Sequence, residues 1–310
     1  MGRGIDHRLI RTAAAAVMFL CCHGAPAQQR VQFTQYMLNP LVVNPAYAGA
    51  DEALSLTFIQ RSQWLGLENA PTTQALSGHT AFMKKHIGLG VTLINDRIGV
   101  HKNFTAVTNY AYHLNVGEKS FLSMGVLAGV NNQRSDYNSL IGYQSPDPKL
   151  YNPVIAQTFF DFGAGIYYRS PRVNIGFSAP DILPGRINLN DTLSIRMSAA
   201  NYFLFSQYNF PLTEDLEAQP SMMVKYLPGL PVSFDMNMNM TYRKVLTFGF
   251  SYRKSESVDF LLKGFITEQL QFGYSYDHAI GQIARLSNGS HELMIHYLFR
   301  FVQSNAISPR

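Results

Sequence analysis

Apolar and polar residues alternate with a period of two through most of this chain, from Leu54 to Phe301. The clearest segment is 232–242, in which every even position is apolar and every odd position is polar. Successive side chains of a strand point to opposite faces, so this segment predicts a strand with one apolar and one polar face. No window has the period of a long amphipathic helix. The chain is therefore predicted to be all-β.

About fourteen segments carry this pattern, and the range that the pattern allows is about 12–16. They lie at 54–63, 72–83, 86–95, 103–115, 120–133, 156–169, 171–179, 193–208, 218–227, 231–242, 245–254, 257–266, 268–277 and 291–301. Several connections in the last third contain only a few residues, which is the spacing of antiparallel hairpins. The strands are therefore expected to pair with their neighbours in the sequence.

Two architectures accept such strands: a soluble β-sandwich, and a transmembrane antiparallel β-barrel that turns its apolar face to lipid. Many segments reach about ten residues, the length that a tilted strand needs to cross a bilayer. The polar faces carry amide, hydroxyl and charged side chains, whereas the apolar faces lack charge. Aromatic residues typical of interfacial girdles stand near segment ends, namely Tyr167, Tyr168, Tyr242, Tyr252, Tyr274, Tyr276 and Tyr297. These features favour the transmembrane barrel.

Residues 1–27 have the organisation of a secretory signal peptide. A short apolar run at 12–22 is too short for a transmembrane helix, and Ala25-Pro26-Ala27 fits an A-x-A cleavage site. Three arginines precede the run, namely Arg3, Arg8 and Arg11. We expect cleavage after Ala27 and export to the cell outer membrane.

Both cysteines of the chain, Cys21 and Cys22, lie in this signal. Lipidation is an alternative to plain cleavage, although Leu20 stands where a lipidation signal has a small residue. The mature chain would contain no cysteine, which excludes disulfides, thiolate metal sites and a cysteine nucleophile. Removal of the signal lowers the net charge from +5 to +3 and leaves no basic run, so no nucleic acid partner is expected.

Residues 28–53, between the signal and the first strand, lack the strand alternation. Their core reads Gln32-Phe33-Thr34-Gln35-Tyr36-Met37-Leu38-Asn39-Pro40-Leu41-Val42-Val43-Asn44-Pro45-Ala46-Tyr47-Ala48-Gly49. A residue before proline is kept out of the helical region, so both Asn-Pro steps predict extended or turn geometry. We expect a strap or plug here, then a barrel at 54–301 and a tail at 302–310.

This opening motif resembles that of the PorP/SprF family, outer-membrane proteins of the type IX secretion and gliding motility system. The resemblance covers essentially the whole mature chain. It continues through Arg61-Ser62-Gln63-Trp64, Gly88-Leu89-Gly90, Asn95-Asp96-Arg97-Ile98-Gly99, Tyr276-Asp277 and Gly289-Ser290-His291-Glu292-Leu293-Met294-Ile295. The matching motif positions are Arg61, Gln63, Trp64, Asp96, Gly99, Asp277, Ser290, His291 and Glu292. The tail departs from the family, whose barrels often stop near an aromatic residue.

The resemblance implies a non-enzymatic barrel that supports export or surface anchoring of specific large cargo proteins. It also implies contacts with periplasmic ring and lipoprotein components, in addition to outer-membrane lipid, and it implies no cofactor. A passive or substrate-specific outer-membrane transporter or porin is the alternative. A transporter needs a continuous polar path through the lumen, whereas a docking barrel does not.

Two interpretations of the opening motif remain open, and both can hold. It is either a plug that stabilises the barrel or a contact site for a periplasmic partner or cargo. On the second interpretation, the partner-binding residues are Phe33, Gln35, Tyr36, Asn39, Pro40, Asn44, Pro45, Tyr47 and Gly49. We expect this segment on the periplasmic side, where the N-terminus of an even-stranded barrel normally stays.

Catalysis and metal binding have weaker support. Asp277-His278 and His291-Glu292 place an acid beside an imidazole, but adjacent strand residues face opposite sides, so neither pair forms a dyad. The histidines at 79, 86, 101 and 113 lack metal-ligand spacing. Methionines 236, 238 and 240 repeat every two residues, as expected of a lipid-facing strand. The segments 134–155 and 181–192 are the expected extracellular loops, because barrels place their longer loops outside.

Overall fold

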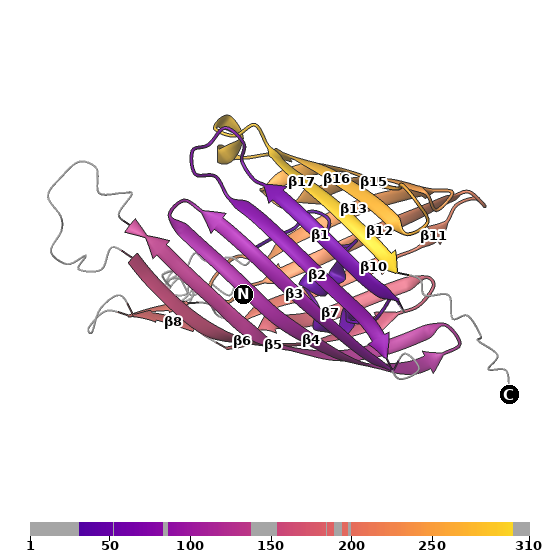
Figure 1. Cartoon of the computed structure of the whole chain (residues 1–310). Coiled ribbons are helices and arrows are strands. Elements are labelled where there is room, and N and C mark those ends of the chain that lie inside the picture. The colour runs from indigo at the N-terminus through magenta and orange to yellow at the C-terminus, as the bar shows by residue number, and fades with distance from the viewer. Residues whose placement is uncertain are drawn as a thin grey trace, which may run out of the picture.

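The computed structural model describes residues 31–51, 53–82, 86–137, 154–183, 185–188, 194–197 and 200–299. Within these ranges the chain forms a closed antiparallel barrel (Figure 1). The expected signal peptide, Phe301 and the tail lie outside them, as do residues 138–153 of the first expected loop and much of the second.

Fourteen strands make the wall, in agreement with the predicted number and pairing. They are β1 (Leu54–Ser62), β2 (Thr72–Phe82), β3 (Ile87–Ile98), β4 (His101–Gly117), β5 (Ser120–Asp136), β6 (Val154–Arg169), β7 (Val173–Asp181), β10 (Asn201–Tyr208), β12 (Leu216–Tyr226), β13 (Ser233–Tyr242), β14 (Leu246–Arg253), β15 (Ser257–Phe265), β16 (Leu270–Ala279) and β17 (Ser290–Phe299). Each pairs with the wall strand that follows it, and β1 pairs with β17 to close the ring. Closure leaves every wall strand with two neighbours, as lipid requires.

Three short strands lie outside this wall pattern. β8 (Gly185–Asn188) and β9 (Ser194–Met197) form a separate hairpin, and β11 (Phe210–Pro211) pairs only with β12. The single strand expected at 193–208 is therefore wrong, because its first part pairs with β8 and only β10 enters the wall.

The alternation places side chains on the predicted faces. Met236, Met238 and Met240 on β13 are exposed on the outside of the barrel, and Asp235, Asn237 and Asn239 are buried inside. Large apolar side chains are exposed along the outer faces of the other wall strands as well. Because lipid rather than water covers such a belt, the fold is that of a membrane-spanning barrel. No helix among the described residues is long and apolar enough to cross a membrane.

The two ends of the barrel differ in their connections. At the end where β1 begins and β17 ends, short links such as 118–119 and 170–172 join the strands. At the opposite end the connections include 63–71, 137–153 and 280–289. Outer-membrane barrels have short periplasmic turns and longer outer loops, so the end with the longer connections is the extracellular end.

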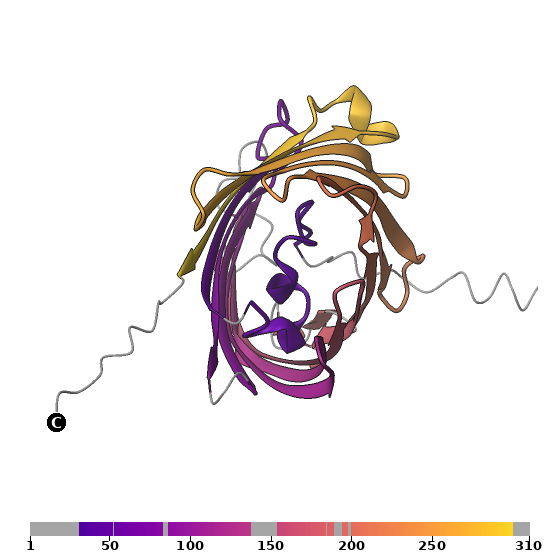
Figure 2. The same ribbon diagram turned by 90° about the vertical axis from the view of Figure 1, so that its right-hand side faces the viewer.

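Residues 31–51, hereafter the strap, lie inside the barrel rather than outside it. Figure 2 looks along the barrel and shows the strap in indigo within the wall. It contains two 3₁₀ turns, η1 (Pro40–Val42) and η2 (Pro45–Tyr47); a third, η4 (Gln282–Arg285), lies between β16 and β17. The strap thus occupies the lumen, and its polar groups pair with the lumen wall.

Candidate functional site

The strap takes its shape from its two Asn-Pro steps. Pro40 and Pro45 stand at the start of η1 and η2, where a missing N–H costs nothing. Asn44 caps η2, since its side-chain oxygen accepts a 3.0 Å hydrogen bond from the amide of Ala46. Gly49 ends the segment with φ +78°, which favours glycine. The strap is thus a series of tight turns rather than a helix or strand.

A buried charged cluster holds the extracellular end of the strap. Arg61 on β1 donates to Asp277 on β16 at 2.7 Å and to Glu292 on β17 at 3.0 Å. The amides of Thr34 and Gln35 each donate to Glu292 at 2.9 Å, and the Thr34 hydroxyl donates to Asp277 at 2.7 Å. Arg61 is 1% exposed and Glu292 0%. Loss of one partner would leave a buried charge unpaired, so these groups act as a unit.

A second group of charges extends this cluster around the lumen. Lys225 on β12 lies 2.8 Å from Asp235 on β13, and Arg253 on β14 lies 3.5 Å from the same carboxylate. Lys225 also donates to the side chain of Gln32 at 2.7 Å. The beginning of the strap is therefore surrounded by paired charges from several strands.

The middle of the strap is held by single hydrogen bonds and close packing. Asn237 donates to the Tyr36 hydroxyl at 2.6 Å, and Asn39 donates to Ser77 at 2.8 Å. Burial, together with the carboxylate of Asp235, raises the pKa of Tyr36 well above its usual range, so the phenol is neutral. These contacts come from β13 and β2, on different sides of the barrel.

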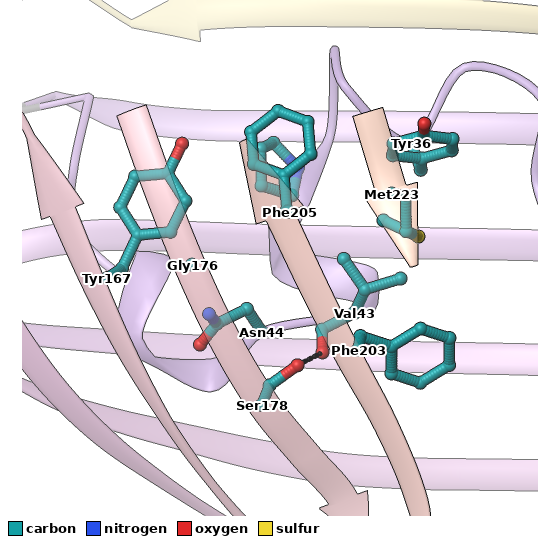
Figure 3. A pocket seen from close by; sticks show the side chains of 10 residues that line it. Tyr36, Val43, Asn44, Tyr167, Gly176, Ser178, Phe203, Phe205 and Met223 are labelled. Atoms are coloured by element: carbon teal, nitrogen blue, oxygen red, sulfur yellow. Dashed lines mark hydrogen bonds between the residues drawn. The ribbon is translucent and has the colours of Figure 1, made fainter. Parts of the chain in front are cut away.

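The strap packs against β6, β7, β10 and β12 with almost no space left. Figure 3 shows Tyr36, Val43 and Asn44 facing wall residues, with the hydroxyl of Ser178 donating to the carbonyl of Val43 at 2.7 Å. Asn44 also donates to the carbonyl of Ile166 at 3.0 Å. The remaining cavity has a volume of about 10 Å³, roughly that of one water.

Glycines in the wall allow the strap backbone to approach. A Cβ atom at Gly88 would overlap the carbonyl oxygen of Ala48, and one at Gly125 would overlap the backbone of Ala46. Both overlaps involve backbone atoms, so a side chain here could not simply move aside. The paired glycines noted in the sequence at 88–90 therefore serve crowded lumen packing.

The periplasmic end of the strap is bound by histidine and tyrosine side chains. The amide of Gly49 donates to His79 Nδ1 at 3.0 Å, and His79 Nε2 lies 3.3 Å from Asp51. The hydroxyl of Tyr47 donates to Asp51 at 2.8 Å. Burial acts to raise the pKa of Asp51, but the hydrogen bonds from His79 and Tyr47 outweigh it and hold this pKa below its usual range.

A second histidine supports the same end. His113 Nε2 donates to the carbonyl of Ala48 at 2.9 Å, while its Nδ1 lies 2.6 Å from the hydroxyl of Ser123. Arg169 donates to the carbonyl of Ala50. Tyr167, expected in an outer girdle, instead faces the lumen and packs edge-on against Tyr47, with ring centroids 5.4 Å apart. That part of the girdle prediction is wrong, because the alternation of β6 places odd positions inside.

All nine residues predicted to bind a partner belong to the strap and lie within the lumen. Their side chains contact the wall rather than the outer surface. The one not yet described is Phe33, which joins an apolar cluster with Ile59 and Met294. Their role in partner binding stays a prediction.

The motif positions divide into three groups. Arg61, Asp277 and Glu292 meet in the buried cluster. Trp64 and Ser290 meet near the extracellular rim, where the Trp64 amide donates to the Ser290 hydroxyl at 3.1 Å. The others lie apart from these groups and from one another. Gln63 lies near the same rim, and Asp96 accepts a hydrogen bond from Thr73. Gly99 lies in the β3–β4 turn with φ +58°, and His291 lies 2.6 Å from the Tyr274 hydroxyl on the outer face. As expected, His291 and Glu292 do not form a dyad.

Sequence reasoning missed the second charged group and the histidines that hold the strap. Asp235 and Arg253 are directly opposite each other in the β13–β14 hairpin, so the hairpin register would have paired them. In the β12–β13 hairpin, Lys225 is opposite Ser233. Ser233 lies on the same face of β13 as Asp235, so the register would also have placed Lys225 beside this carboxylate. No sequence pattern around His79 or His113 indicates a contact with residues 48–51.

A cavity of about 730 Å³ opens above the strap at the extracellular end. Its lining comes from several strands and connections, including Gln63, Trp64, Asp96, His101, Gln133 and Tyr137. Its inner boundary includes Arg61, Asp277 and the first strap residues. We call this cavity the vestibule. Among the described residues, no group of three or more His, Cys, Asp or Glu could hold a metal ion.

Solved outer-membrane proteins are similar to this chain at low sequence identity. The toluene transporter TbuX of Ralstonia pickettii is 12% identical, with a TM-score of 0.52, over 84% of this chain and 93% of that one. Omp33 of Acinetobacter baumannii is 9% identical, with a TM-score of 0.46, over 80% of this chain and 99% of that one. At these identities the TbuX likeness supports the barrel fold alone. No curated protein sequence matched the chain.

The family comparison is more specific than the fold comparison. The family described as type IX secretion system membrane protein PorP/SprF matches residues 25–297, which include the strap and nearly all of the wall. Those residues contain the opening motif, the buried Arg61 cluster and both Asn-Pro turns. The chain therefore belongs to the PorP/SprF family of type IX secretion system membrane proteins.

Proposed function

We propose that this barrel supports the export or surface anchoring of specific large cargo proteins and docks periplasmic components of the secretion machine. The observation that carries the proposal is the filled lumen. A strap with tight packing and a buried charged cluster leaves no wide polar path for solutes, whereas a docking protein needs none. The proposal assigns the barrel no catalytic role.

The vestibule supports the cargo part of the proposal. It is open at the extracellular end, about 730 Å³ in volume, and lined by both charged and amide side chains. A secreted domain that stays at the cell surface would meet this face of the barrel first. The short turns at the other end are the surface that remains for periplasmic ring and lipoprotein components.

Deletion of the gene is the first test. One or a few large surface proteins should disappear from the cell surface, while general type IX export continues. Proteomics of surface and culture fractions would measure this. A broad defect in small-solute uptake with normal surface proteins would contradict the proposal and favour a transporter.

Affinity capture from detergent-solubilised membranes is the second test, and it separates the two interpretations of the strap. Gln35, Tyr36, Asn39 and Asn44 are replaced by alanine in a barrel that still shows heat-modifiable migration on gels. If the strap contacts the partner, capture should weaken. If these variants assemble and capture the partner fully, the strap is only a plug, and the contact lies elsewhere.

A further inference from the structure

The outer face of the barrel changes from apolar to polar at one level of strands β1, β2, β3, β5 and β6, whereas β4 has Phe104 at that level. Towards the extracellular end, Phe58 on β1 gives way to Gln60, and Leu76 on β2 gives way to Gln74. Phe160 on β6 likewise gives way to Thr158. Such a change marks where the hydrocarbon of the outer leaflet ends and its headgroups begin.

Hydrogen bonds join the side chains at this level into two groups, one on each side of Phe104 on β4, which is exposed at the same level. Gln74 donates to Gln60 at 3.0 Å, and Asn95 donates to Gln74 at 3.3 Å. Asn132 donates to Thr158 at 2.8 Å. These side chains lie on the outer surface and serve no contact with the strap. They form two ordered polar groups at the headgroup level.

Three cations stand in the next row towards the extracellular end. Arg97 on β3 is directly opposite Lys102 on β4, and Lys102 is directly opposite Arg134 on β5. All three side chains are exposed, and Lys102 and Arg134 also border the mouth of the vestibule. Like charges directly opposite each other destabilise a sheet, so this row needs an anion to offset the repulsion.

The described part of the chain supplies no such anion. None of the three cations forms an ion pair with a described residue. The nearest carboxylate in sequence on that face, Asp136, is half-buried and makes contacts of its own. The anion is therefore expected from outside the described residues.

The row occupies only one side of the barrel. On the opposite side, the outer face near the same end carries the exposed aromatic side chains Tyr202, Tyr226 and Tyr252. The first two are stacked, with ring centroids 6.1 Å apart. Lys254 lies in that region as well, and its ammonium is 5.5 Å from the centre of the Phe234 ring. A general headgroup belt would be spread around the barrel, whereas this one is local.

We propose that Arg97, Lys102 and Arg134 bind the phosphate groups of one lipid of the outer leaflet. The two polar groups below them would receive the polar sugar portion, and the apolar face of β1 to β6 would receive the acyl chains. Arginine pairs with phosphate through two parallel hydrogen bonds, and a central lysine adds a point charge. Glycolipids with phosphorylated headgroups fill the outer leaflet of an outer membrane, which is why the ligand is a lipid.

The test uses the purified full chain in detergent and native mass spectrometry with lipid A in its bis-phosphorylated and dephosphorylated forms. The variant is Arg97→Gln/Lys102→Gln/Arg134→Gln. The matched control, Lys119→Gln/Arg172→Gln/Lys244→Gln, removes the same charge from exposed turns at the opposite end. The wild type and the control should prefer the phosphorylated form by about tenfold or more, and the triple variant should lose that preference.

Several outcomes would overturn the proposal. One is retention of the phosphorylated lipid by the triple variant within about twofold of the wild type. Equal loss in the control, or equal binding of the dephosphorylated lipid by the wild type, would do the same. Displacement of the lipid by millimolar inorganic phosphate would mean a plain anion site. If the triple variant does not assemble, Lys102→Gln alone should lower the affinity for the phosphorylated lipid about threefold. An unchanged affinity in that variant would contradict the proposal.

Discussion

Single residues in this barrel have opposite requirements on its two faces. Met238 is 45% exposed to lipid, while its neighbour Asn237 is 5% exposed and bonded to Tyr36. The sequence indicates both faces correctly. It does not indicate that the inner face touches a strap, so a lumen position is not automatically tolerant of change. We therefore expect Asn237→Arg to displace Tyr36, so the effect of this substitution on the protein should not be mild.

Met238→Arg should impair assembly of the barrel. A charge near the bilayer midplane costs about 2–4 kcal/mol on the lipid face of a strand. The fraction of protein with heat-modifiable migration, measured after refolding into lipid vesicles, checks this. Met238→Leu is the matched control and should assemble like the wild type. Normal assembly of the arginine variant would mean that this face does not meet lipid.

Arg61→Met should lower the free energy of unfolding by about 3–5 kcal/mol, because it leaves Asp277 and Glu292 buried without their cation. Urea unfolding in lipid vesicles, followed by tryptophan fluorescence of Trp64, measures the change. Arg243→Met is the control, since the Arg243–Asp215 pair is exposed. Exposed pairs contribute at most about 1 kcal/mol. Similar losses in both variants would contradict a special role for the buried cluster.

At the scale of elements, the strap and the wall are fitted to each other along most of the strap's length. The strap meets glycines where its backbone touches the wall, and charges or amides where its polar groups need partners. Gly88 lies beside Ala48 at the periplasmic end, far along the strap from the charged cluster. Each end can therefore be loosened separately.

Gly88→Ala should loosen the periplasmic end of the strap while the wall still forms. The added methyl group overlaps backbone atoms of Ala48 and cannot be relieved by a side-chain rotation. Limited proteolysis of the refolded protein should then cut within the strap. Gly264→Ala is the control, because its nearest neighbour would be a side-chain atom of Leu246 at 3.4 Å. An intact strap in the Gly88 variant would show that the wall can yield instead.

At the scale of the whole molecule, the barrel is a closed wall with a filled lumen and a vestibule at one end. Whether solutes pass depends on the strap as well as on the lumen diameter, which grows with the number of strands. The same wall without the strap would have a polar lumen of fourteen strands, and lumens of this kind conduct ions when nothing fills them.

Wild-type protein in planar lipid bilayers should show no sizeable steady conductance. Deletion of residues 32–49 should open a conducting pore, provided that the shortened barrel still migrates as a folded species. The Gly88→Ala variant should show intermediate, fluctuating conductance, because only one end of its strap is loosened. A large steady conductance of the wild type would mean that the strap leaves the lumen in a membrane.

The sequence by itself determined most of the strands, their neighbours and the faces of most of their side chains, although it placed one strand at 193–208 and Tyr167 wrongly. These properties depend on a two-residue period and on short hairpins, which are local. The tertiary structure alone decided the location of the strap and the partners of its polar groups. Arg61 and Glu292 are 231 positions apart, and they meet only because β17 closes on β1. The hydrogen bonds between the strap and the wall likewise join residues that no local pattern relates, so only the closed barrel brings them together.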